Sequence, residues 1–329
     1  MNEKSALSSI SPSGKGFGWK FDQRRYLNKY GTLIFFAILL ISNAFFTPNF
    51  VSYGTIRNLL LQVFPIMLVS LGMMMVISSE GIDISVGAIM SISASVTVKL
   101  FSLGYGLLPS VLAGLSAACL CGLFNGGMIA RFRIQPIVIT LILMIAGRGL
   151  AQIILGELSM SFYYTTLADL GAYKAGGLIP VQFIIMLVVI IAMGFIVKTT
   201  VFARHVEAIG DNYRASKLSG VNIPFVIIGV YALCGALSGL AGIMEAARIN
   251  SVNAASLGLL VELDAIAAVA IGGTPFTGGK ARILGTVLGA LIVQLVTIIV
   301  NMNNIQFHYS LVIKAVIIVL ALYLQKERA

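Results

Sequence analysis

The sequence has little charge and no short hydrophobic periodicity. Asp, Glu, Lys and Arg make up 10% of the 329 residues, whereas hydrophobic residues make up 58%, and the mean hydropathy is +0.99. So little charge excludes an ordinary soluble domain. The apolar residues form long blocks without the alternation of membrane strands. We therefore predict an all-α integral membrane protein, a polytopic transmembrane helical bundle.

Cysteine and histidine are scarce. Cys119, Cys121 and Cys234 lie within apolar blocks and lack the spacing of metal ligands, so we interpret them as small packing residues. His205 and His308 fall in different loops, which we expect on opposite sides of the membrane. No catalytic cluster surrounds either one. We predict that the chain is not an enzyme and binds no metal or cofactor of its own.

Charge-free stretches give the number of spans. Residues 175–197 and 218–244 carry no charge, and each is at least as long as the roughly 20 residues that cross a bilayer as a helix. The apolar blocks together predict about ten spans. The blocks are 31–46, 56–78, 86–103, 107–130, 134–156, 178–197, 224–247, 257–272, 283–301 and 309–324.

The net charge of +10 raises the question of whether the chain binds nucleic acid. Basic residues instead sit in short segments between apolar blocks, where they orient helices in a membrane. If the N-terminus is cytoplasmic, the segments on the cytoplasmic side hold 16 of the 22 Lys and Arg residues, six of them in the N-terminal tail and ten in later segments. This asymmetry predicts that both termini are cytoplasmic and that nucleic acid is not a partner. The ten are Arg131, Arg133, Lys198, Arg204, Arg214, Lys217, Lys280, Arg282, Lys326 and Arg328.

The same pattern divides the chain into regions. Residues 1–30 are polar and predict a mobile cytoplasmic tail. Residues 31–325 form the transmembrane domain, which includes a cytoplasmic loop at 198–223, and residues 326–329 form a second tail. The first block lacks a cleavage site of small residues, so we expect an uncleaved helix. Ten spans also leave open two inverted halves of five.

The segment SSEGIDISVGA, residues 78–88, places Glu80 and Asp83 among glycines and serines between two apolar blocks. Such a break suits a discontinuous helix whose free backbone groups face a cavity. It equally suits a cytoplasmic turn in which Asp83 or Ser85 caps the next helix. The sequence leaves both interpretations open.

Five charged residues lie inside or at the ends of spans, namely Arg148, Glu245, Arg248, Glu262 and Asp264. A charge at mid-helix costs about 2.5–3.5 kcal/mol on insertion scales, so these residues need partners or a water-filled path. Glu245 and Arg248 are spaced i, i+3 and favour a structural pair. Asp264 begins a run of small residues and is also compatible with a helix interface.

The segment GGTPFTGGKAR, residues 272–282, superficially suggests a phosphate-binding loop. That motif requires Gly, four residues and then Gly-Lys-Ser/Thr. Here Thr274 stands at the first Gly position and Ala281 at the magnesium-ligating position. We predict no nucleotide site on this chain.

Four segments together resemble the membrane permeases of bacterial ribose-type sugar ABC importers. They are EGIDISVGA (80–88), GLFNGGMIARFRIQPIVITLILMIAGRG (122–149), EAIGDNYRASKLSGVNI (207–223) and LDAIAAVAIGGTPFTGGKARILGTVLGALI (263–292). The stretch IQPIVITLILMIAGRGLAQII, residues 134–154, is most similar to permeases of galactofuranose importers.

The resemblance implies a multi-pass subunit of the bacterial cytoplasmic (inner) membrane, surrounded by lipid. It implies three protein partners: a cytoplasmic ATPase that uses ATP and Mg, a periplasmic sugar-binding protein, and a second permease copy or paralogue. The candidate translocation path comprises Glu80, Asp83, Asn125, Arg148 and Asp264. The rival hypothesis is a secondary transporter that relays protons or ions through Glu245, Glu262 or Asp264.

Residues 205–224 resemble the loop that couples such permeases to their ATPase. We expect one short helix over 206–218, with Val206, Ile209, Tyr213 and Leu218 along one side. Such a helix suits docking into a groove of a partner. The positions that match the pattern of the family or face the partner are Glu207, Ala208, Gly210, Arg214 and Gly220.

Overall fold

The computed structural model describes residues 23–163, 165–172, 174–175 and 179–306, and further along the chain residues 309, 311, 312, 314–316 and 319. Within these residues, six helices are long and apolar enough to span a membrane. They are α2 (Tyr53–Ser78), α4 (Leu107–Phe132), α5 (Pro136–Leu155), α7 (Val181–Thr199), α10 (Ile223–Ile249) and α12 (Ile283–Met302).

Shorter elements complete the described part of the chain. The remaining helices are α1 (Gln23–Phe46), α3 (Val86–Ser102), α6 (Thr166–Ala172), α8 (Val201–Asp211), α9 (Tyr213–Leu218) and α11 (Val261–Ile271). Strand β1 (Ser159–Ser161) pairs antiparallel with β4 (Ser251–Asn253), and Ser159 lies opposite Asn253. Strand β2 (Lys174–Ala175) pairs antiparallel with β3 (Ile179–Pro180).

The predicted helical membrane bundle is confirmed, and two predicted boundaries are wrong. Helix α1 begins at Gln23, so the predicted end of the tail at residue 30 falls inside it, because Gln, Arg and Lys are good helix formers. The block 257–272 is not a full span, because α11 begins only at Val261, after positive φ angles at Gly258 and Leu260. Its 11 residues measure about 16 Å, roughly half of a hydrocarbon core. Most of the expected span 309–324, and the tail 326–329, lie outside the described residues.

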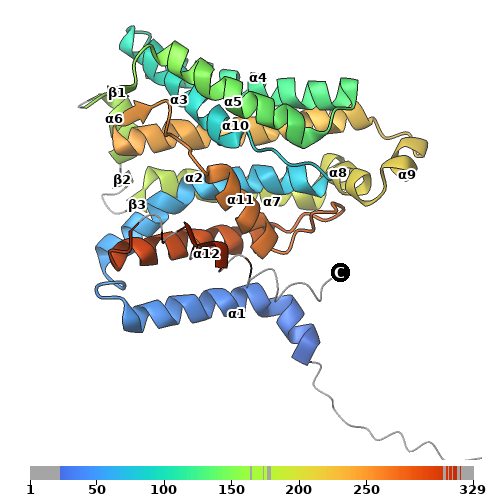
Figure 1. The fold of residues 1–329 in the computed structure, drawn as a ribbon, viewed down its shortest axis with the longest axis horizontal. Coiled ribbons are helices and arrows are strands. Elements are labelled where there is room, and N and C mark those ends of the chain that lie inside the picture. The colour runs from blue at the N-terminus through green and yellow to red at the C-terminus, as the bar shows by residue number, and fades with distance from the viewer. Residues whose placement is uncertain are drawn as a thin grey trace, which may run out of the picture.

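Helix α2 lies at the centre of the bundle (Figure 1), and it is buried from Val63 to Ser78. Helix α10 packs against both α2 and α4 through small residues. A Cβ atom at Gly72 would lie 2.9 Å from the Cα atom of Cys234, and one at Gly122 would overlap the carbonyl oxygen of Tyr231. Close backbone approach at small residues is typical of helices packed in membranes.

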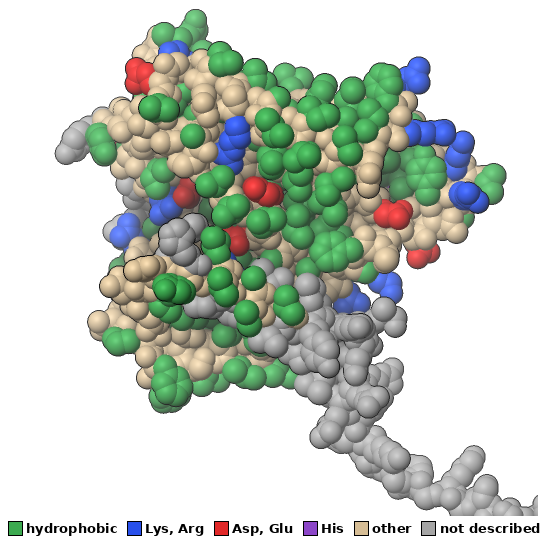
Figure 2. Space-filling model, viewed as in Figure 1, with side chains coloured by type: hydrophobic (Ala, Val, Ile, Leu, Met, Phe, Trp, Pro, Cys, Tyr) green, Lys and Arg blue, Asp and Glu red, His purple; other side chains and the backbone are tan. Residues whose placement is uncertain are grey.

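The outer faces of the bundle are apolar. Large hydrophobic side chains on α4, α5 and α7 are exposed, and Figure 2 shows hydrophobic groups spread over one side of the molecule. Apolar surface of this extent suits contact with lipid rather than water. The exposed side chains include Leu112, Leu120, Ile145, Ile153, Val188, Ile191 and Phe195.

The connections gather at two opposite ends of the bundle. Helices α8 and α9 lie at one end, and α6 with strands β1, β2 and β3 lies at the other (Figure 1). At the first end, the amide of Gly279 donates to the carbonyl oxygen of Ser78 at 3.0 Å. The basic loops 198–223 and 273–282, which we predicted to be cytoplasmic, thus share one end with the break at 79–85.

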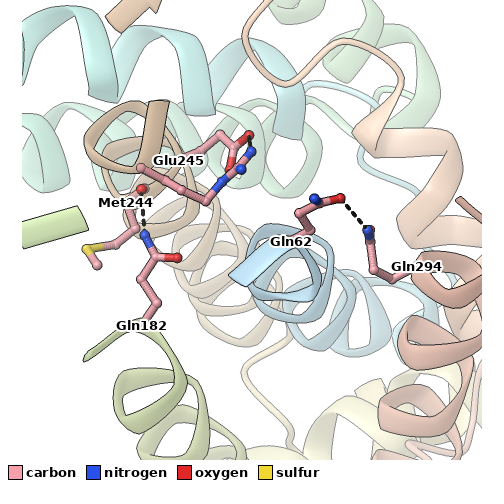
Figure 3. A network of polar contacts seen from close by, with 6 residues as sticks. Gln62, Gln182, Met244, Glu245 and Gln294 are labelled. Atoms are coloured by element: carbon pink, nitrogen blue, oxygen red, sulfur yellow. Dashed lines mark hydrogen bonds and ion pairs between the residues drawn. The ribbon is translucent and has the colours of Figure 1, made fainter. Parts of the chain in front are cut away.

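Uncharged amides link helices inside the apolar bundle (Figure 3). Gln294 on α12 donates to Gln62 on α2 at 3.2 Å, and Gln182 on α7 donates to the carbonyl oxygen of Met244 on α10 at 3.0 Å. In the same region, Arg248 donates to Glu245 at 3.0 and 2.6 Å. The predicted pairing of Glu245 with Arg248 is therefore confirmed.

Candidate functional site

The loop 198–223 contains two helices, not the single helix that we predicted. The side chain of Thr200 caps α8 by accepting a hydrogen bond from Ala203 at 3.3 Å. Helix α8 ends at Asn212, whose backbone is extended, with φ −154° and ψ 98°. The Asn212 side chain then caps α9 by accepting from Ala215 at 2.9 Å. Asparagine is a favoured N-cap residue, so this one position ends the first helix and starts the second.

The break at Asn212 separates the apolar side chains that we expected on one face. Val206 and Ile209 of α8 are buried in the core. Tyr213 and Leu218 of α9 are exposed, and Leu218 is 90% exposed. The prediction of one shared apolar side is thus wrong, because the extended residue changes the orientation of α9 relative to α8.

Helix α9 presents both charge and apolar groups to the surface. Arg214 and Lys217 are exposed beside the exposed Tyr213 and Leu218. Figure 2 shows Lys and Arg side chains at this end of the molecule. A short, mixed surface of this kind suits a groove in another protein.

Gly220 ends α9 with a left-handed backbone geometry. Its φ is +81°. Its amide donates to the carbonyl oxygen of Lys217, and the amide of Val221 donates to the carbonyl oxygen of Ser216. This pair of bonds is the Schellman ending, which needs a left-handed residue and favours glycine. No atom lies within 4 Å of a Cβ placed on Gly220.

Three predicted coupling residues on α8 are buried or partly buried against the rest of the bundle, namely Glu207, Ala208 and Gly210. The Oε1 atom of Glu207 accepts a hydrogen bond from the amide of Ala281 at 2.8 Å. A Cβ on Gly210 would overlap the carbonyl oxygen of Ser78 and lie 2.6 Å from the amide nitrogen of Gly279. Ala208 is partly buried. We call residues 272–282 the glycine-rich loop, and it packs directly against α8.

The amides of Gly279 and Ala281 in the glycine-rich loop are already used within the chain. That of Gly279 donates to Ser78, and that of Ala281 donates to Glu207. A phosphate-binding loop needs free amides that point at the anion.

Asp83 and Asn125 form a buried polar cluster at the break between α2 and α3. Asp83 is fully buried, and its Oδ1 atom accepts from the amide and hydroxyl of Ser85 at 2.9 and 2.6 Å. Asn125 on α4 donates to the hydroxyl of Ser85 at 2.9 Å. Asp83 Oδ2, Asn125 Oδ1 and the Tyr231 hydroxyl have no hydrogen-bond partner among the described residues. Asp83 thus fixes a buried turn before α3. The N-cap residue of α3 is Ser85, and its side chain makes no capping hydrogen bond.

Glu80 lies apart from this cluster. It is exposed, its φ is +64°, and its amide nitrogen would lie 3.1 Å from a Cβ on Gly278. The structure therefore places Glu80 beside the glycine-rich loop and not with Asp83.

Arg148 and Glu262 meet at Gly87 on α3. A Cβ at Gly87 would lie 2.7 Å from Glu262 Oε2 and 3.1 Å from Arg148 Nη2. Arg148 also donates to the carbonyl oxygen of Leu257 in the turn before α11. This contact joins α5 to the start of the short helix α11.

Asp264 forms an ion pair with Lys314, whose Nζ lies 3.0 and 3.1 Å from the two carboxylate oxygens. Figure 2 shows acidic and basic side chains in the middle of a face that is otherwise largely apolar. Each carboxylate of the secondary-transporter hypothesis has a cation nearby: Glu245 has Arg248, Glu262 has Arg148 and Asp264 has Lys314.

Our sequence interpretation missed Lys314 and the amides Gln62, Gln182 and Gln294. Lys314 lies 50 residues from Asp264, so local spacing carries no signal of the pair. An uncharged amide in an apolar block is a detectable signal, which a search for charges overlooks. Among the described residues, no three His, Cys, Asp or Glu side chains gather as metal ligands, and His308 lies outside those residues.

The fold and these sites define a multi-pass helical membrane protein with a short helix pair at one end. Residues 55–322 match the family described as "Branched-chain amino acid transport system / permease component". The chain belongs to this family of transport permeases.

Curated relatives align along most of the chain. The ribose import permease protein RbsC of Escherichia coli (strain K12) is 32% identical over 314 residues, which cover 94% of this chain and 98% of the relative. The galactofuranose transporter permease protein YtfT of the same strain is 37% identical over 278 residues, 84% of this chain and 81% of the relative. The L-arabinose ABC transporter permease protein AraH of Azospirillum brasilense is 30% identical over 325 residues, which cover 98% of this chain and 93% of the relative. The resemblance drawn from the four segments is confirmed. No solved structure matches the chain significantly.

Proposed function

We propose that this chain is the permease subunit of an ATP-driven importer, and that it forms the path of a monosaccharide across the bacterial cytoplasmic membrane. The observation that carries the proposal is the near full-length similarity to permeases named for ribose and L-arabinose. The family description mentions branched-chain amino acids, but the relatives above are all named for sugars. The substrate is therefore a sugar of the ribose or galactofuranose kind.

The ATPase partner docks on α9 and the adjoining end of α8. Support comes from the exposed Tyr213 and Leu218 beside Arg214 and Lys217. The amides of Gly279 and Ala281 are paired within the chain, which supports the assignment of ATP and Mg to the partner. The basic residues of this end favour its location in the cytoplasm.

The other partners follow from the remaining surfaces. A periplasmic sugar-binding protein would dock at the opposite end, where α6 and the pair β1–β4 lie. Lipid contacts the apolar flanks, and a second permease copy or paralogue covers the face that carries charges among apolar groups. Charges within a membrane normally face a protein partner or a water-filled path.

The translocation path is lined by polar groups near the breaks in the helices. Asp83 and Asn125 lie at the break after α2, Arg148 contacts the turn before the short helix α11, and Asp264 lies on the first turn of α11. Transporters place substrate sites at such discontinuous helices. Glu80 belongs instead to the contact of α2 with the glycine-rich loop.

The test asks whether ATP or the proton gradient drives uptake. We expect an ATPase to copurify with the tagged chain, and uptake of a labelled pentose or hexose to stop when ATP is depleted. Uptake should continue when an uncoupler removes the proton gradient at constant ATP. Uptake that survives ATP depletion but stops with the uncoupler would establish the secondary-transporter alternative.

A further inference from the structure

Three segments distant in the sequence meet at the end that carries α8. Glu207 and Gly210 come from α8, Ser78 ends α2, and the third segment is the glycine-rich loop. The hydroxyl of Ser78 donates to the carbonyl oxygen of Lys280 at 3.0 Å, and the amide of Gly279 donates back to the carbonyl oxygen of Ser78 at 3.0 Å. The loop is thus bonded to α2 and to α8 at the same place.

Glycines allow the backbones at this junction to touch. A Cβ on Gly210 would overlap the carbonyl oxygen of Ser78, and one on Gly278 would lie 2.8 Å from the Cα atom of Gly210. Gly278 and Gly279 also have φ angles of +78° and +85°, which side chains rarely adopt. The glycines that mimic a phosphate loop in the sequence therefore make a close contact between chain segments.

Glu207 is the side chain that bonds α8 to the loop. Its carboxylate accepts the amide of Ala281, two residues before α12 begins at Ile283. The other end of the loop follows α11, and a Cβ on Gly272 would lie 2.5 Å from the backbone of Gly285. The two ends of the loop are therefore packed together, so α11 and α12 receive any displacement of the loop.

We infer that α8 is clamped to the glycine-rich loop through Glu207 and Gly210, and that this clamp carries movement of α8 directly to α11, α12 and the end of α2. Glu207 is then a positioning residue that acts within the chain, and not a contact to the ATPase. This inference rests on the proposed function. It explains how a movement at the surface reaches Asp264 on α11 and the Asp83 break after α2 without passing along α7 or α10.

The first test exchanges Glu207 for alanine and for glutamine in the full transporter. Glu207→Ala removes the acceptor for Ala281, and we expect uptake at equal abundance to fall about tenfold, the effect of losing one hydrogen bond to a charged group. ATPase copurification should stay at the wild-type amount, and ATP hydrolysis should no longer respond to loaded binding protein. Glu207→Gln keeps an oxygen at the same place and should remain within about twofold of wild type, as a neutral acceptor suffices.

These variants separate the clamp from a contact with the partner. If Glu207→Gln is as defective as Glu207→Ala, or if either variant loses the ATPase on purification, the carboxylate serves the partner and the inference is wrong. Wild-type uptake by Glu207→Ala also overturns it. If no ATPase copurifies with the wild-type chain and its uptake ignores ATP, the proposed function itself fails.

The second test locks α8 to the loop. The Cβ of Asp211 lies 3.3 Å from a Cβ placed on Gly279, near the spacing that a disulfide needs. The pair Asp211→Cys and Gly279→Cys should cross-link on oxidation, whereas each single variant should not. If the clamp moves as one body, the oxidised pair transports as fast as the same pair after reduction, a comparison in which the strain at Gly279 cancels. Loss of uptake on oxidation, or failure to cross-link, contradicts the inference.

Discussion

At the scale of single residues, a chain of hydrogen bonds links Asp83, Ser85 and Asn125. One serine hydroxyl donates to the carboxylate and accepts from the amide, with distances of 2.6 and 2.9 Å. An unpaired polar group in a buried place costs about 1–3 kcal/mol. The cluster therefore holds the break after α2 against α4, and it leaves one buried oxygen of Asp83 without a partner among the described residues.

Substitution of Asp83 distinguishes this role from that of a simple cap. Asp83→Asn retains an oxygen for the bonds from Ser85, so we expect its uptake to exceed that of Asp83→Ala. The alanine variant should lose more uptake than membrane abundance, measured by labelled sugar accumulation and immunoblot on the same cells. Equal losses in both quantities would show that Asp83 only supports folding.

Some of these residues were predictable from the sequence and others were not. A charge in a Gly- and Ser-rich break between apolar blocks marks Asp83, and a charge inside an apolar block marks Asp264, because burial of a charge is costly anywhere in the chain. Lys314 could not be assigned to Asp264, since 50 residues separate them. Glu80 was wrongly grouped with Asp83 because the two residues between them pass from the exposed turn after α2 into the buried break.

At the scale of elements, single residues decide where the helices begin and end. Asn212 divides α8 from α9, and Gly258 and Leu260 delay the start of α11. Asparagine and glycine are visible signals of such boundaries, so the shortened α11 and the helix pair were within reach of the sequence. The packing of Gly210 on Ser78 was not, because it depends on where the bundle brings the two helix ends.

Gly220 tests the importance of the end of α9. Gly220→Val places a β-branched residue at φ +81°, where side chains cost about 1–2 kcal/mol. We expect normal insertion, reduced uptake, and either less copurified ATPase or loss of stimulation by the loaded binding protein. Gly220→Asn should stay near wild type, because asparagine tolerates this conformation and the space around the site is open.

Two outcomes for Gly220 would contradict this view. Wild-type uptake by Gly220→Val at equal abundance would mean that the loop is only a connection. An equal defect in Gly220→Asn and Gly220→Val would mean that a partner needs the space beside this residue, so that bulk and not backbone strain causes the loss.

The whole molecule is a bundle whose two ends differ in composition. The end with α8, α9 and the glycine-rich loop carries Arg204, Arg214 and Lys217, while the opposite end carries α6 and the short strands. Charge counts predicted this grouping of loops because loop charge orients helices during insertion. They overstated the length of α11, since composition alone does not separate a full span from a half span.

The last prediction concerns the orientation of these ends. Leu218 is 90% exposed on α9 and Leu103 is 63% exposed after α3, so a cysteine at either site is accessible to an impermeant maleimide. Leu103→Cys should be labelled in spheroplasts with intact membranes, and Leu218→Cys only after the membrane is opened. The wild-type chain, with Cys119, Cys121 and Cys234, supplies the background. Labelling of Leu218→Cys from outside would reverse the topology and place the proposed ATPase surface on the wrong side of the membrane.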